Sequence, residues 1–141
     1  GDRSPIAAFT RKRRASFPSF EAAIANYESK PPMNAFDPDV LRLYVAHGFR
    51  AAPEGVRLKC DPEHEARTYE ASVPSPIFDQ LPELTTRVVV IGSGDGDPPA
   101  IMAPRIADRL PEATFVPRDE LNHFGPFVDP QGIATIIAVG G

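Results

Sequence analysis

Hydrophobic positions in the last third of the chain alternate between strand-like and helix-like patterns. Residues 88–91 are a continuous run of valine and isoleucine, which predicts a strand buried on both faces of a parallel sheet. Residues 101–110 repeat apolar side chains at helical spacing, and residues 113–116 predict a second, shorter strand. A final helix is predicted after Asp129-Pro130, where an acid precedes proline at a helix start. This order predicts an α/β unit whose two strands pair in parallel.

The region from residue 10 to residue 80 has a different pattern, with short helical segments separated by prolines. Ser19, Asp37 and Asp61 each precede a helical segment, and side chains of this kind accept hydrogen bonds from the first turn of a helix. Residues 56–60 alternate apolar and basic positions, which predicts a short, half-exposed strand. We expect this strand to be too short to anchor a sheet. The region is therefore predicted to be mostly helical.

Together the patterns predict an α/β fold class, with a helical cap or lid in residues 1–84 and a βαβα part of a core in residues 85–141. Two strands cannot form a stable parallel sheet by themselves. We therefore expect the missing strands, and the cover for an unpaired strand edge, to come from a separate chain, a missing segment or a homodimer. The chain begins at Gly1 without a methionine, which we interpret as a truncation boundary.

Composition and charge exclude several classes of protein. The formal net charge is -4 and the isoelectric point is near 5.3, which argues against a nucleic-acid-binding surface. Cys60 is the single cysteine of the 141 residues, so an internal disulfide cannot form and a cytoplasmic location is predicted. No apolar run approaches the roughly 18–20 residues that span a bilayer. We therefore predict neither a nucleic-acid partner nor a membrane partner.

The candidate chemistry lies in two loops that follow the predicted strands. Asp95 comes directly after the first strand, and His123 follows the second. A carboxylate bonded to one imidazole nitrogen fixes the tautomer, so the other nitrogen can accept a proton from a nucleophile. We expect an Asp95 oxygen within about 2.6–3.2 Å of a His123 ring nitrogen. Asp97 is the alternative acid, and ordinary roles as a helix cap and as a loop histidine remain open for Asp95 and His123.

Other site patterns are incomplete. No Gly-x-Ser-x-Gly nucleophile elbow occurs in the chain, and Ser93 is interpreted as a turn residue. His64 lacks the second histidine of a His-Glu-x-x-His zinc site, and the loop after residue 91 fits neither a dinucleotide nor a calcium motif. We therefore predict no metal and no cofactor.

Residues 88–130 resemble the carboxy-terminal part of the α/β-hydrolase superfamily. The resemblance rests on Gly92-x-x-Asp95-x-x-x-Pro99, on Asn122-His123-Phe124 and on Asp129-Pro130. The upstream region, with Tyr44-x-x-His47-Gly48-Phe49, is similar to the helical cap of bacterial members. The resemblance implies a nucleophile–acid–histidine triad on an eight-stranded, mostly parallel sheet, with Asp95 as the acid and His123 as the base.

The sequence departs from the family at three points. Asn122 stands where members usually have glycine, and the loop after the first predicted strand carries two aspartates, Asp95 and Asp97. No nucleophile is present in the sequence. The choice between a serine enzyme, such as an esterase, lactonase or peptidase, and an aspartate enzyme, such as an epoxide hydrolase or dehalogenase, therefore stays open.

The resulting hypothesis is the cap and acid/histidine-bearing half of a cofactor-independent α/β-hydrolase. We expect it to act on a small apolar ester or related acyl compound, with Phe17, Phe36 and Tyr44 lining the substrate pocket. Its partner would be the amino-terminal half of the same enzyme, without which it would be inactive. The alternative is a non-catalytic binding or interaction module derived from the same fold.

Overall fold

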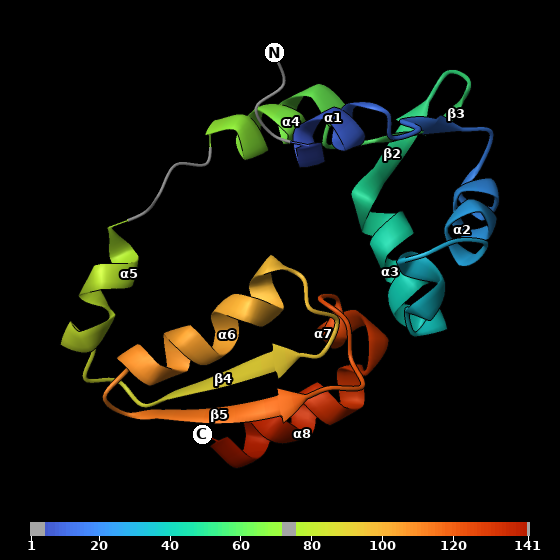
Figure 1. Ribbon diagram of the computed structural model, residues 1–141. Helices are drawn as coiled ribbons and strands as arrows, with labels where there is room; N and C mark the ends of the chain where they lie inside the picture. Colours follow the sequence, from blue (N-terminus) through green and yellow to red (C-terminus); the bar gives the residue numbers. More distant parts are fainter. Residues whose placement is uncertain (1–4, 72–75, 141) are drawn as a thin grey trace. The chain divides into compact units, whose positions relative to one another are not determined.

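The computed structural model describes residues 5–71 and 76–140, and the chain divides into two compact units, Gly1–Pro74 and Ser75–Gly141. The first unit contains α1 (Pro5–Arg11), β1 (Ser16–Phe17), α2 (Phe20–Glu28), η1 (Met33–Ala35), α3 (Pro38–Gly48), β2 (Phe49–Ala52), β3 (Gly55–Leu58) and α4 (Pro62–Ala71). The second contains α5 (Ile77–Gln80), η2 (Leu81–Glu83), β4 (Val88–Ser93), α6 (Pro98–Arg109), β5 (Ala113–Arg118), α7 (Gly125–Val128) and α8 (Pro130–Gly140). Figure 1 labels the α-helices and the strands β2 to β5.

The helices of the first unit begin where the sequence predicts. The Ser19 hydroxyl accepts a hydrogen bond from the Ala22 N–H at 3.2 Å at the start of α2. One Asp37 carboxylate oxygen accepts the N–H groups of the first turn of α3, and Asp61 accepts the Glu63 N–H at 3.0 Å at the start of α4. Each cap satisfies backbone donors that have no partner inside the helix.

The expectation that the strand at residues 56–60 anchors no sheet is wrong. β3 is the central strand of a three-stranded antiparallel sheet in the order β1-β3-β2. Gly55, the first residue of β3, has φ +122°, and a Cβ there would lie 2.3 Å from the Phe17 carbonyl oxygen. A glycine is therefore required where β3 begins beside β1.

The first unit has a closed apolar core. Leu41, Val45 and Phe49 are at most 1% exposed. Rings from α2, α3 and the sheet pack on them, and Tyr27 makes edge contacts with both Tyr44 and Phe49 at centroid distances of 5.8 and 6.2 Å. Such pairs add to the free energy gained by burying apolar surface.

The second unit is built on a parallel pair of strands, as predicted. β4 pairs with β5 from Val88↔Ala113 to Ser93↔Arg118. Figure 1 shows α6 on one side of this pair and α8 on the other. Within the residues that the structure describes, β5 is the one strand that pairs with β4. The side chains of residues 88–91 are half-buried.

The division between the units differs from the expected boundary after residue 84. The Arg109 guanidinium, at the end of α6, donates to the Phe78 carbonyl at 2.9 Å and lies 4.7 Å from the centroid of the Phe78 ring. These contacts attach α5 to α6. Residues 76–84 therefore belong to the second unit rather than to the cap region.

Candidate active site

A close approach between two loops of the second unit forms the site. The Gly94 N–H, just after β4, donates to the Leu121 carbonyl at 3.0 Å. A Cβ at Gly94 would lie 2.2 Å from the Asp119 carbonyl oxygen, which is shorter than any side chain tolerates. The lack of a side chain at Gly94 thus lets the loop after β4 lie against the loop after β5. Both loops follow carboxyl ends of parallel strands, where ligand sites of open α/β sheets form.

Asp95 joins the two loops through its carboxylate. One oxygen accepts the backbone N–H of His123 at 2.7 Å, and the other accepts the Ser93 hydroxyl at 3.1 Å. Desolvation raises the pKa of Asp95, but the hydrogen bonds from His123, Ser93 and Asp97 outweigh it, so the pKa lies below its ordinary value. Asp95 is therefore ionised at neutral pH, and it holds the backbone of the loop that carries His123.

The expected hydrogen bond between Asp95 and the His123 ring does not form. Among the described residues, the carboxylate that faces the ring is that of Asp97, whose oxygen lies 3.8 Å from Nδ1. The other Asp97 oxygen accepts the Ala100 N–H at 2.9 Å and caps α6. The helix cap is thus Asp97 rather than Asp95, and the structure brings both acids and His123 together.

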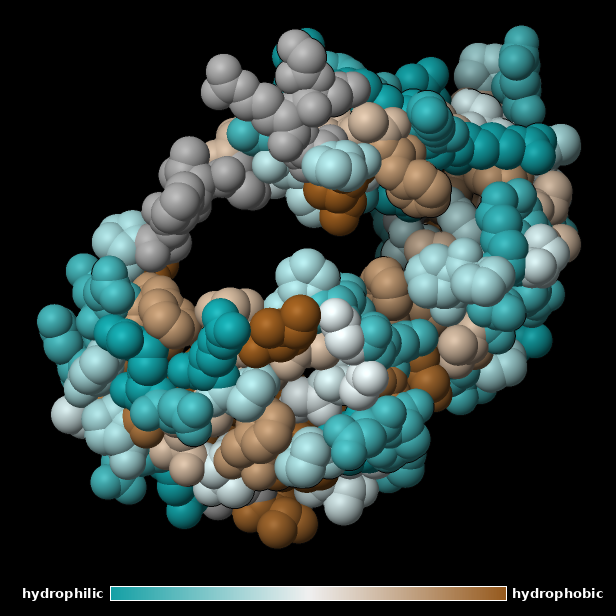
Figure 2. Space-filling model, viewed as in Figure 1, coloured by the Kyte–Doolittle hydropathy of each residue, from teal (hydrophilic) through white to brown (hydrophobic). Residues whose placement is uncertain are grey.

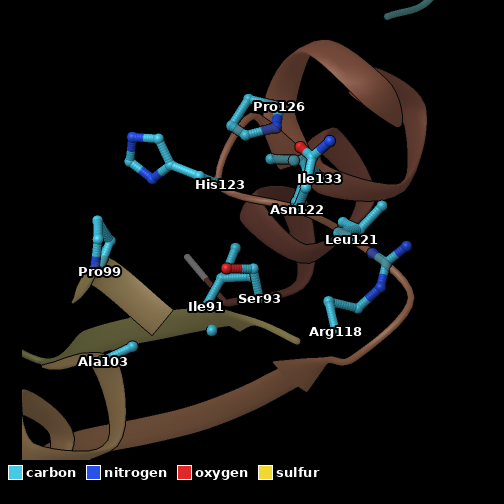
Figure 3. A pocket seen from close by; sticks show the side chains of 12 residues that line it. Ile91, Ser93, Pro99, Ala103, Arg118, Leu121, Asn122, His123, Pro126 and Ile133 are labelled. Atoms are coloured by element: carbon cyan, nitrogen blue, oxygen red, sulfur yellow. The ribbon is translucent and has the colours of Figure 1, made fainter. Parts of the chain in front are cut away.

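A cavity of about 260 Å³ adjoins the site and lies within the second unit. Figure 3 shows the His123 side chain projecting on the side of Pro99, while Arg118 and Leu121 border the opposite side. The lining is mostly apolar, with Ser93, Asn122 and His123 among its polar members. The His123 side chain is 51% exposed, so its ring is accessible to a reacting group.

An ion pair that the sequence analysis missed joins the two ends of the loop that carries His123. The Arg118 guanidinium, at the end of β5, donates to an Asp129 oxygen at 2.6 Å, and the other Asp129 oxygen accepts the Gly132 N–H at the start of α8. These bonds hold the pKa of Asp129 below its ordinary value. The pattern indicated Asp129 as a helix cap but gave no signal for its pairing with Arg118.

The three aromatic residues expected to bind substrate lie in the first unit. Phe17 and Phe36 are 2% and 6% exposed, and Phe36 packs edge-on against Tyr44 at a centroid distance of 6.2 Å. The Tyr44 hydroxyl accepts a hydrogen bond from Arg13 at 3.1 Å. Phe17 also lines a cavity of that unit, whereas Phe36 and Tyr44 do not. Substrate binding by these residues stays a prediction.

Within residues 5–71 and 76–140, no three His, Cys, Asp or Glu side chains are grouped as a metal site would require. None of the described helices combines the length and the apolar character needed to cross a membrane.

Comparisons with known proteins identify the fold. No protein-family model matches the chain, and no curated protein matches it. The crystal structure of E-2-(acetamidomethylene)succinate hydrolase, an α/β-hydrolase, matches with a TM-score of 0.65 and 16% identity, covering 94% of this chain and 50% of that one. The chain therefore spans about half the length of that structure. The protein has a mixed α/β structure similar to the α/β-hydrolase fold.

Proposed function

We propose that the chain is the cap and the acid/histidine-bearing part of a cofactor-independent α/β-hydrolase that cleaves esters or related acyl compounds. The observation that carries the proposal is the contact between Asp95 and His123 at the carboxyl ends of two parallel strands, 2.7 Å from carboxylate oxygen to backbone nitrogen. The resemblance of the fold to an α/β-hydrolase supports the same assignment. Fold alone does not assign an activity, so the site carries the argument.

In this proposal His123 is the general base. One ring nitrogen takes the proton of the nucleophile as the nucleophile bonds to the acyl carbon, and the carbonyl π electrons move to oxygen. When the carbonyl re-forms and the ester bond breaks, the imidazolium returns the proton to the leaving alcohol. A water molecule, activated by the same ring, then releases the acid and restores the nucleophile.

We assign the orienting role to Asp95 rather than to Asp97. The Asp95 carboxylate already holds the backbone N–H of His123, and the proposal requires the His123 ring to rotate so that Nδ1 meets that carboxylate. Half of the His123 side chain faces solvent, which leaves room for this rotation. Asp97 has a separate role because it caps α6. Catalytic hydrogen bonds are often loose in structures without substrate.

The nucleophile belongs, in this proposal, to an amino-terminal half of the enzyme. Ser93 lies in the site, but its hydroxyl donates to Asp95. Ile91 and Asp95 stand where the Gly-x-Ser-x-Gly pattern of a nucleophile elbow has glycines. The half-buried apolar side chains of β4 would be covered by further strands of that half. A homodimer covering the same edge and a cytoplasmic location stay predictions.

The test is a pair of histidine substitutions in a protein that joins this chain to its nucleophile-bearing half. His123→Ala should lower kcat/KM for a p-nitrophenyl ester by about a thousandfold, since general acid–base catalysis contributes that order of rate. His47→Ala is the matched control, because His47 is an exposed residue at the end of α3. Circular dichroism would check that both variants fold. An unchanged rate in His123→Ala would refute the proposal and favour a binding module.

A further inference from the structure

The first unit contains a second cavity, larger than the one beside His123. Its volume is about 440 Å³, within the range of small-molecule pockets. Its walls come from α1, the segment that follows it, the end of α2, the turn before η1, and α4. The cavity thus lies among elements of a single unit, and its geometry does not depend on the site at His123.

The cavity has apolar walls. Phe17 and Tyr27 are almost fully buried and form part of the lining. Ile6 and Phe9 of α1 also line it, although they are 51% and 73% exposed, and Tyr69 of α4 is 37% exposed. Figure 2 shows hydrophobic side chains at the surface next to α1. Exposed large apolar side chains around a hollow indicate a surface that binds the apolar part of another molecule.

Positive charge is concentrated on the same lining. Four cationic side chains line the cavity, and Glu65 is the one acid among the lining residues. Glu65 is paired with one of these cations, Arg13. Among the described residues, no ion pair includes the other three, Lys12, Arg14 or Lys30.

Neutral groups hold two of these cations in place. The Arg14 Nε donates to the Ser16 carbonyl at 3.0 Å, and its guanidinium carbon lies 4.4 Å from the centroid of the Phe17 ring. The Lys30 ammonium donates to the Asn26 side-chain oxygen at 3.1 Å. Neither partner is acidic, and both cationic groups have further N–H donors that could bind an anion.

We propose that this cavity binds a small organic carboxylate with an apolar body, such as an aryl or acyl acid. The carboxylate would lie against Arg14 and Lys30, and the apolar body would pack on Phe9, Phe17 and Tyr69. A guanidinium binds a carboxylate through two parallel hydrogen bonds. An inorganic anion would use the cations but leave the apolar walls without a contact. The proposal stands independently of the catalytic role of His123.

Binding is tested by titrating the 141-residue chain with phenylacetate and following its 1H–15N spectrum. We expect saturable shifts of the backbone signals of residues that line this cavity. Phenylacetamide has the same shape without the charge, and acetate or inorganic phosphate has the charge without the ring. Each of these probes should bind at least about tenfold more weakly. Equal binding of any of them would overturn the proposal.

Substitutions locate the site. Lys30→Gln and Arg14→Gln should each raise the Kd for phenylacetate by about fivefold, a typical effect of removing one partly exposed charge. Lys59→Gln is the matched control, because Lys59 is an exposed lysine that does not line the cavity. Phe9→Ser, at a 73% exposed position where folding should be unaffected, removes part of the apolar wall and should also weaken binding. The cavity is not the site if Lys30→Gln and Lys59→Gln change the Kd equally. It is also not the site if none of the cavity variants changes the Kd.

Discussion

The two units of the chain differ in how completely they bury their apolar side chains. In the first unit, the largest fully buried side chains are Leu41, Val45 and Phe49, and aromatic rings surround them. In the second unit, the buried hydrophobic residues are 6–8% exposed, and the strand residues 88–91 stay half-buried. The first unit thus has a closed core. The second unit carries the candidate catalytic residues beside a two-stranded sheet whose strand residues 88–91 stay half-buried.

The ion pairs of the two units also differ in what they hold together. In the first unit, Arg11 bonds to both Glu63 and Glu70 and joins α1 to α4. In the second, Arg118 and Asp129 enclose the loop that carries His123. Ion pairs thus support packing between helices in the first unit, whereas in the second unit an ion pair holds the loop that carries the candidate base.

The largest expected effect is on stability. It is tested by making the same Phe→Ala substitution in each unit and comparing the losses. Phe49→Ala should lower the free energy of unfolding by about 3–5 kcal/mol, because it leaves a cavity in a closed core. Phe115→Ala, at a side chain that is 40% exposed, should cost about 1–2 kcal/mol. Denaturant unfolding followed by circular dichroism measures both losses. Equal losses would contradict the difference between the two cores.

The next prediction separates the two acids of the second unit. In the complete enzyme, Asp95→Asn should lower kcat by about a hundredfold or more, since it removes the charge that stabilises an imidazolium. Its side-chain oxygen can still accept the His123 N–H, so the loop should hold. Asp97→Asn keeps an oxygen to cap α6 and should lower kcat by less than about tenfold. A larger loss in Asp97→Asn would transfer the orienting role to Asp97.

A loss of rate of about a hundredfold, the lower limit expected for Asp95→Asn, is expected when the approach of the two loops is disturbed. Gly94→Ala places a Cβ 2.2 Å from the Asp119 carbonyl oxygen, so the loops must separate. A shift of about 1 Å at a catalytic group costs roughly a hundredfold in rate. Gly48→Ala is the control, since a Cβ there meets nothing within 4 Å. The His123 amide signal should move in Gly94→Ala alone, and an unmoved signal with full activity would disprove the role of this contact.

The smallest expected effect is the acid sensitivity of the first unit. Hydrogen bonds from Arg11 and Arg67 lower the pKa of Glu63 from 4.5 to about 2. Because the folded-state pKa is the lower one, this carboxylate stabilises the fold above about pH 4.5, and the stabilisation is lost as pH falls toward 2. Glu63→Gln should be less stable than the unchanged chain at neutral pH, and the difference should vanish below about pH 2. A difference that persists there would contradict this origin.

The sequence predicts the elements whose signals are local. Ser19 and Asp37 mark helix starts because each side chain bonds within its own first turn. The β-branched run at residues 88–91 predicts a strand whose parallel pairing with β5 is confirmed, but its side chains are half-buried rather than buried on both faces.

The features that sequence reasoning missed depend on contacts between distant residues. The three-stranded sheet of the first unit forms because β1 and β2 both pair with β3, and neither has an alternating pattern of its own. Both Asp95 and Asp97 lie beside His123, but Asp95 contacts its backbone N–H whereas Asp97 lies 3.8 Å from its ring. The sequence therefore predicts which loops meet but not which carboxylate the ring contacts.

The most direct test of the account is a rate measurement on the 141-residue chain alone. If the chain carries the acid and the base but not the nucleophile, hydrolysis of p-nitrophenyl acetate should stay at the rate of buffer, and Ser93→Ala should change nothing. In the proposed arrangement the other half supplies both the nucleophile and the oxyanion-hole N–H groups, which are the main sources of transition-state stabilisation. Saturable hydrolysis at an ordinary enzyme rate, abolished by Ser93→Ala or His123→Ala, would show that the chain contains a complete active site and would contradict the account.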